Sequence, residues 1–293
     1  MRLSLQTYDD VGEYSAHVAP LLLADEHRHN LMLGVINTLQ AQPDVYPDRF
    51  LAAADADGEP VAAMLMTPPF NVIVSDVRVQ EGANIEPVVD MLVSALLEHH
   101  PRLTGVTANR PYAELVSDAW RRRSAGRARV FRTQGVYSIE RVTEPASVVG
   151  SPRGATIADR ELVLDWYRAF EAEVHMDMPM HILERQLESR LRGEGGGVDL
   201  WEAGGEVVSL TGYATSTPNG ARIGPVYTPE RSRRRGYASA LVAATTRRLL
   251  GSGRRFCFLY TDLANPTSNH IYRAIGYEQV CVAEDWRFDH TPG

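Results

Sequence analysis

The sequence contains a basic segment whose residue types and order suit the binding of a phosphate or another anion. Four arginines stand in five residues, and Gly236 and an alanine-rich apolar run follow them directly; the arginines are Arg231, Arg233, Arg234 and Arg235. The first turn of a helix presents unpaired N–H groups and partial positive charge, and glycine lets a ligand approach the backbone closely. Neighbouring arginines add charge-assisted hydrogen bonds. The segment therefore predicts an anion site at a helix start, with a solvated basic turn as the alternative.

The net charge of the whole chain indicates that only the basic segment itself, and not the protein as a whole, attracts anions. The chain has 293 residues and a formal net charge of -7, and every one of its basic residues is arginine. An acidic protein attracts nucleic acid poorly, so we expect no nucleic-acid partner. The absence of lysine excludes a catalytic lysine and the lysine-bearing phosphate loop.

The remaining composition narrows the class of protein further. No run of about 20 apolar residues is present, and the N-terminal residues lack the order of a signal peptide, so we expect a cytoplasmic protein without a membrane partner. Cys257 and Cys281 are the only cysteines, and both stand among apolar residues. We expect both to be buried, with neither a disulfide framework nor a cysteine-rich metal site.

Hydrophobic periodicity predicts two similar series of elements. The first has strands over 49–54, 61–67, 70–74, 103–107 and 136–139 and helices over 85–97 and 111–120. The second has helices over 159–173, 237–250 and 267–274 and strands over 198–203, 207–216, 222–228, 256–261, 279–282 and 286–288. Asp57-Gly58 and Gly204-Gly205 are expected to form turns with positive φ angles. The basic segment thus follows a strand and opens a helix.

The repeated order favours a duplicated domain. Pro145, Gly150, Pro152 and Gly154 mark the boundary, so we predict one domain over 1–145, a linker over 146–154 and a second domain over 155–293. The predicted fold class is α/β, more narrowly α+β. Each domain is expected to contain a mixed, mostly antiparallel sheet flanked by helices.

Two motifs of the second half resemble those of the GNAT acetyltransferase superfamily. The acyl-CoA loop of that family reads Arg/Gln-x-x-Gly-x-Gly/Ala after a strand, as Arg233–Ala238 does here, and Asn265–Tyr277 matches a second family pattern. The resemblance covers the chain from residue 155 to residue 289 and implies a tandem GNAT protein. Residues 75–84 lack the loop motif and Trp120 stands near the place of the second motif's tyrosine. The first half is therefore similar to a degenerate copy.

The resemblance also implies roles for individual residues. Acetyl-CoA, as cosubstrate, would lie between the strands that end near Thr228 and Thr261. Its implied contacts are Val226, Thr228, Arg233, Arg234, Arg235, Gly236, Tyr237, Ala238, Asn265, Ser268 and Asn269. Tyr272 matches the family's general acid, which would protonate the departing CoA thiolate; the alternative is a core tyrosine with its hydroxyl bonded to the backbone. Direct transfer needs no enzyme nucleophile, so Cys257 is expected to be structural.

The general base is not identified by the motifs. Many family members carry a glutamate on the strand before the loop, but residues 221–226 contain no acid. The candidates are water, Glu173, Asp177 and Glu202. The Met-rich segment 174–181 is expected either to line the acceptor pocket or to pack in a loop, and its two histidines alone do not indicate a metal.

The predicted function is that of an acetyl-CoA-dependent N-acetyltransferase, with direct transfer to a primary amine of a small molecule or protein. The alternatives are a non-catalytic acyl-CoA-binding regulatory module and a tandem enzyme with a specialised acceptor, as in mycothiol synthase. The sequence identifies neither the acceptor nor the acyl-chain preference, and does not distinguish a monomer from a homodimer. Arg121, Arg122 and Arg123 are expected to form a solvated, acid-paired face.

Overall fold

The chain forms two compact units. A computed structural model describes residues 2–124, 126–174 and 178–290. Unit 1 comprises Met1–Val136, Asp262–Ala264 and Val280–Gly293, and unit 2 comprises Tyr137–Thr261 and Asn265–Gln279. Among the described residues, no helix has both the length and the apolar character that crossing a membrane requires.

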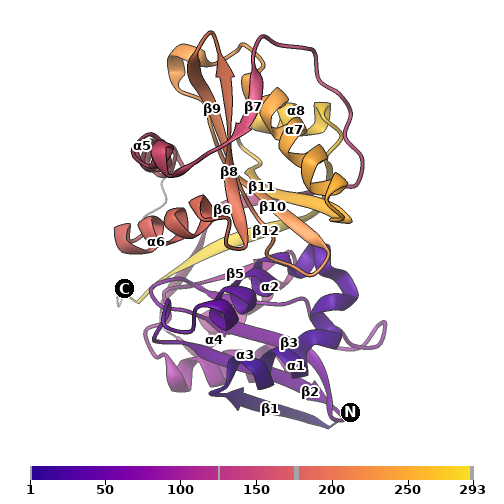
Figure 1. Cartoon of the computed structure of the whole chain (residues 1–293). Helices are drawn as coiled ribbons and strands as arrows, with labels where there is room; N and C mark the ends of the chain where they lie inside the picture. The colour runs from indigo at the N-terminus through magenta and orange to yellow at the C-terminus, as the bar shows by residue number, and fades with distance from the viewer. Residues whose placement is uncertain (1, 125, 175–177, 291–293) are drawn as a thin grey trace. The chain divides into compact units, whose positions relative to one another are not determined.

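The order strand, two helices, three strands, helix, strand, helix, strand occurs twice along the chain (Figure 1). The first series is β1 (Leu3–Tyr8), α1 (Val11–Leu22), α2 (Glu26–Ala41), β2 (Phe50–Ala56), β3 (Glu59–Met66), β4 (Val72–Val74), α3 (Glu86–His99), β5 (Gly105–Asn109), α4 (Tyr112–Arg123) and β6 (Arg127–Ile139). The second is β7 (Ser151–Gly154), α5 (Arg160–Glu173), α6 (Met180–Leu191), β8 (Gly196–Ala203), β9 (Glu206–Ala214), β10 (Gly220–Tyr227), α7 (Tyr237–Gly251), β11 (Phe256–Asp262), α8 (Pro266–Ala274) and β12 (Glu278–Asp289). Short 3-10 helices cover Leu23–Asp25, Ile157–Asp159 and Glu230–Ser232.

The sheet of unit 2 has helices on both faces. Its strand order is β6-β11-β10-β9-β8-β7, and β10 and β11 are parallel, whereas β9 pairs antiparallel with both β8 and β10. Helices α5 and α6 cover one face and α7 and α8 the other (Figure 1). The first face buries Val163, Leu164, Tyr167, Leu183 and Leu187 against Val198, Leu200 and Leu210. This mixed sheet between helices is the predicted fold class.

Unit 1 repeats this arrangement. Its sheet runs β1-β2-β3-β4-β5-β12, with β4 and β5 as its parallel pair. Successive strand residues point to opposite faces, and the three consecutive residues Ala52, Ala53 and Ala54 are all fully buried, so both faces of the sheet are covered. On one side α3 and α4 form the main core cluster. On α1 the Tyr14 hydroxyl donates a hydrogen bond to the Met64 carbonyl of β3 at 3.1 Å.

The last strand of each series lies partly in the sheet of the other unit. Strand β12 pairs antiparallel with β5, where Ala283 lies opposite Asn109 and Arg287 opposite Gly105. Residues Tyr137–Ile139 of β6 belong to unit 2. The units therefore differ from the predicted division into 1–145 and 155–293, because strand pairing joins the end of the chain to unit 1. The predicted linker over 146–154 also contains β7.

Local turn and burial predictions are confirmed, whereas several elements were missed. Asp57 and Gly58 have φ angles of 54° and 91°, and Gly204 and Gly205 have 62° and 80°. Cys257 and Cys281 are buried, and desolvation raises the pKa of each thiol to about 12. Arg121 pairs with Asp118, and Arg122 and Arg123 pair with Asp90, as expected for a solvated face. The patterns above predict none of β1, α1, α2, α6 and β7.

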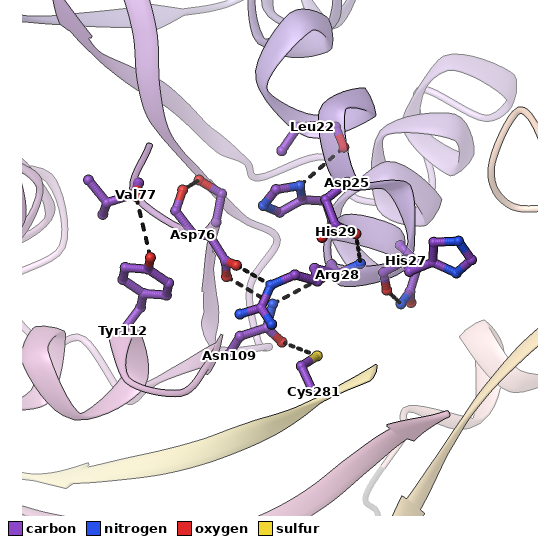
Figure 2. A network of polar contacts seen from close by, with 12 residues as sticks. Leu22, Asp25, His27, Arg28, His29, Asp76, Val77, Asn109, Tyr112 and Cys281 are labelled. Atoms are coloured by element: carbon purple, nitrogen blue, oxygen red, sulfur yellow. Dashed lines mark hydrogen bonds and ion pairs between the residues drawn. The ribbon is translucent and has the colours of Figure 1, made fainter. Parts of the chain in front are cut away.

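In unit 1, side chains connect the chain beyond β4 to the end of β5 (Figure 2). Asp76, two residues after β4, accepts from the Arg28 Nε of α2 and, at 2.9 Å, from the Asn109 Nδ2 at the end of β5. Asn109 Nδ2 also donates to the Arg28 carbonyl at 3.0 Å, and the Cys281 thiol donates to Asn109 Oδ1 at 3.3 Å. Arg28, Asp76 and Asn109, which we call the Arg28 network, thus join α2 to two strand ends.

The Arg28 network is expected to stabilise unit 1. Asp76→Ala removes the acceptor of a part-buried guanidinium and an amide, so we expect a loss of about 2–3 kcal/mol in the free energy of unfolding. The measurement is urea unfolding followed by circular dichroism. Asp118→Ala is the matched control, because its pair with Arg121 is exposed and should contribute less than about 1 kcal/mol. Equal effects of the two substitutions would show that the network does not stabilise the unit.

Candidate active site

Strands β10 and β11 separate within unit 2 after a short parallel pairing. The paired residues are Gly220, Ala221 and Arg222 with Phe256, Cys257 and Phe258. Among the described residues, no pair joins β11 to the remainder of β10, Ile223–Tyr227. Beyond Arg222 the facing edges of both strands therefore offer backbone groups that a further extended segment can pair with.

A bulge in β10 begins where the strands separate. Ile223 lies opposite Tyr213 and Val226 opposite Thr211, so β10 contains one more residue than β9 between these pairs. Gly224 occupies the bulge with a φ of 138°, and Pro225 has no N–H to donate to a ladder. Bulges of this kind bend a strand and turn its peptide groups away from the sheet. The hydrophobic pattern predicts this strand but not the bulge, which Gly-Pro within a strand indicates.

The basic segment forms an exposed turn directly before α7. Arg234 and Gly236 have positive φ values of 62° and 80°, and Gly236 is the N-cap of α7. No described residue accepts a hydrogen bond from the backbone N–H groups of Arg234–Ser239. Alternation of left-handed and right-handed backbone around several free N–H groups produces a concave, positively polarised surface that suits an anion. The predicted anion site at this helix start has this geometry.

The arginine side chains of the basic segment differ in whether they have bonding partners. Arg233 donates through Nε to the Thr228 carbonyl at 2.8 Å and pairs with Glu173 of α5. The Thr228 hydroxyl is 2.8 Å from that of Ser209 on β9. Arg231, Arg234 and Arg235 are exposed and have no acidic partner among the described residues. Arg233 therefore fastens the turn to α5, while the other arginines leave their charge available.

The second motif, Asn265–Tyr277, contains α8. The Asn265 side chain caps this helix by accepting from the Ser268 N–H at 3.1 Å, and Asn269 Nδ2 donates to the Asn265 carbonyl at 2.7 Å. Asn269 is buried, whereas Asn265 is exposed. Both asparagines thus have structural bonds of their own at the position where β11 gives way to α8.

Tyr272 lies one turn further along α8 and is 9 % exposed. It belongs to a core cluster with Ile223 of β10 and Leu259 of β11, both on the separating parts of these strands. Within residues 2–124, 126–174 and 178–290, nothing hydrogen-bonds to its hydroxyl, contrary to the alternative of a backbone-bonded core tyrosine. Desolvation raises the pKa of Tyr272 to about 12, so the phenol is protonated at neutral pH.

The base candidates are held by other groups or lie outside the described residues. Glu173 accepts from Arg233, and Glu202 on β8 accepts from Arg153 Nε at 2.8 Å. Arg153 in turn pairs with Asp159, and this bonding lowers the pKa of Asp159 to about 2. Asp177 lies outside the described residues, as do His175 and Met176. Glu173 and Glu202 are thus each engaged in an ion pair with an arginine.

Comparisons with known proteins agree with this architecture. Residues 203–287 match the family model described as FR47-like protein. A GCN5-related N-acetyltransferase from Sphaerobacter thermophilus has a TM-score of 0.66 at 16% identity, over 99% of this chain and 96% of that chain. A tandem GNAT protein from the clavulanic acid biosynthesis pathway, determined without AcCoA, has a TM-score of 0.62 at 14% identity, over 100% of both chains. A GNAT-family acetyltransferase from Colwellia psychrerythraea has a TM-score of 0.59 at 10% identity, over 98% of this chain and 100% of that chain.

No curated protein sequence matches the chain. The structural similarities extend over both units at low identity, so they establish the fold. The family match begins at the end of β8 and covers the remainder of unit 2, about half of that unit, including the basic turn and α8. The chain therefore has the fold of these GNAT acetyltransferase structures, and its residues 203–287 are similar to the FR47-like family.

Proposed function

We propose that the protein is an acetyl-CoA-dependent N-acetyltransferase whose active site lies in unit 2 and which acetylates a primary amine directly. The observation that carries the proposal is the conjunction of separated strand edges with free N–H groups at the adjacent helix start. An extended amide-bearing arm ending in a pyrophosphate, as in acyl-CoA, matches both features. The arm would pair with β10 near Val226, and the pyrophosphate would accept hydrogen bonds from the N–H groups of Arg234–Ser239.

Unit 1 supports the assignment to unit 2 by contrast. In unit 1 the carboxyl ends of the parallel strands are connected by the Arg28 network, with Asp76 and Asn109 bonded to each other. The corresponding strands of unit 2 separate. The proposed stoichiometry is accordingly one acetyl-CoA per chain.

The proposed reaction forms the C–N bond of the amide and breaks the C–S bond of the thioester and one N–H bond of the amine. The neutral amine nitrogen attacks the acetyl carbonyl carbon, the C–S bond breaks, and the electron pair leaves with the CoA sulfur. The amine proton passes to water, since the candidate bases Glu173 and Glu202 are paired with arginines. The Tyr272 hydroxyl is free to donate to the sulfur. The Tyr272 phenol, with a pKa of about 12, is a much weaker acid than an ordinary thiol of pKa about 8.5. Its contribution in the transition state is therefore a hydrogen bond to the developing thiolate and not a completed proton transfer.

The turn before α7 gives the first test. Gly236→Ala places a side chain at a φ of 80°, with its Cβ 2.8 Å from Val148, and so disturbs the N–H array. We expect the Kd for acetyl-CoA, measured by isothermal titration calorimetry, to rise at least about 10-fold as charge-assisted bonds are lost. The matched control is Gly253→Ala, since Gly253 also has a positive φ, 99°, but lies after α7 in open space. Unchanged acetyl-CoA affinity in Gly236→Ala would contradict the proposed pyrophosphate site.

Tyr272→Phe tests the proposed donor. The substitution keeps the buried ring and removes the hydroxyl, so kcat for CoA release should fall about 10²–10³-fold with little change in acetyl-CoA affinity. Tyr277→Phe is the control, because that tyrosine is buried in the same cluster and its hydroxyl bonds Thr246 at 2.8 Å. We expect Tyr277→Phe to reduce stability by about 1 kcal/mol and to keep kcat.

Measurement of acetyl-CoA binding and of CoA release also distinguishes an enzyme from a non-catalytic binding module. Saturable acetyl-CoA binding without CoA release on any amine would identify a non-catalytic module. Full turnover by Tyr272→Phe would exclude Tyr272 as the donor.

A further inference from the structure

A second group of polar residues lies on the face of unit 2 covered by α5 and α6. Arg190 at the end of α6 donates through Nη1 to the Tyr167 hydroxyl of α5 at 2.9 Å, and its guanidinium lies 5.9 Å from the centre of that ring. Arg222 of β10 lies 5.4 Å from the ring centre of Tyr260 on β11. We call Tyr167, Arg190 and Arg222 the α6-side cluster. None of these residues was singled out by sequence motifs.

The α6-side cluster adjoins the bulge of β10. A Cβ built on Gly212 of β9 would lie 2.7 Å from the Gly224 carbonyl oxygen, 2.7 Å from the Tyr167 hydroxyl and 2.9 Å from Arg190 Nη1. These three atoms therefore converge beside Gly212, where any side chain would collide with them. Arg222 stands two residues before Gly224 on the same strand, so both arginines lie beside the place where β10 leaves β11.

The two arginines lack the acidic partners that their neighbours have. On α5 and α6, Arg160 pairs with Glu161 and Glu188, and Arg168 pairs with Asp165 and Glu184. Of the described residues, none provides a carboxylate for Arg190 or Arg222.

The absence of a carboxylate beside Arg190 and Arg222 in the described part of the chain is electrostatically unfavourable. Although the side chain of Arg222 is exposed, desolvation lowers its pKa, Tyr260 acts in the opposite direction, and the positive charge of Arg190 lowers the pKa to a smaller extent. Two cations that repel each other and lose hydration are stabilised by an anion.

We infer that the α6-side cluster binds the carboxylate of the acceptor, so that the amine substrate is a small amino acid or a close analogue. The inference rests on the proposed function and narrows its acceptor. A planar guanidinium fits a carboxylate with two hydrogen bonds, and the Tyr167 hydroxyl, which accepts from Arg190, has its own proton to donate. The cluster adjoins the bulge, so the amine and the carboxylate must be few bonds apart. A lysine side chain of a protein has no carboxylate at that spacing.

A panel of matched amines tests the inference. Glycine, β-alanine and γ-aminobutyrate are compared with their amides, with aminomethylphosphonate and with a lysine-containing peptide. Direct titration into the free protein and steady-state CoA release are both measured. The wild type should prefer at least one of the acids to its amide by about 10-fold or more in Kd and in kcat/KM, as a charged hydrogen-bond pair provides.

Substitutions locate the preference. Arg190→Gln and Arg222→Gln should each remove most of the preference for the acid and leave the Kd for acetyl-CoA within about 2-fold. Tyr167→Phe keeps the buried ring and should reduce the preference less. Arg185→Gln, an exposed arginine on the same helix α6, should change none of these values.

The outcomes also distinguish the inference from the proposed function. Equal use of acids and amides by the wild type, a preference that survives both arginine substitutions, or stronger binding of the phosphonate or the peptide would each overturn the inference. Absence of acetyl-CoA binding would overturn the proposed function alone, because titration of the amino acids into the free protein still measures the cluster.

Discussion

The short parallel pairing of β10 with β11 sets the position of every candidate group in unit 2. Three residue pairs hold the strands together, and the bulge at Gly224 and Pro225 then turns β10 away. Each strand leads into a helix: α7 begins after the nine residues that follow β10, and α8 after the three residues that follow β11. Separation of the strands therefore separates the two helix starts. It leaves the free N–H groups before α7 on one strand and the helix that carries Tyr272 on the other.

The two units have the same order of elements but different side chains at the ends of their parallel strands. Polar groups that leave water need partners. In unit 1 an arginine, an aspartate and an asparagine provide them for one another, and the parallel pairing of β4 and β5 extends to Val74 opposite Ala108. In unit 2 glycine and proline occupy the strand and arginines the turn beyond it. Backbone groups there stay available to a ligand.

The parts of the candidate site that depend on neighbouring residues could be predicted from the sequence. The turn before α7 and the start of α8 are local features, and glycine, asparagine and proline at their ends indicate them directly. The α6-side cluster could not be predicted, since Tyr167, Arg190 and Arg222 come from three elements and meet only in the folded sheet. Helix α6 itself was missed, because the Met-rich segment before it was treated as a loop or rim. The partners of Glu173 and Glu202 likewise depend on tertiary contacts.

The pairing of β12 with β5 could not be predicted from hydrophobic pattern, because any strand of suitable pattern could close either sheet. It has a consequence for synthesis of the protein. Asn109 leaves the ribosome long before Ala283, its partner across the two strands. Throughout that interval β5 has an open edge, and contacts so distant in sequence form late. The sheet of unit 1 is therefore completed only after β12 has been made, although most of its strands are made first.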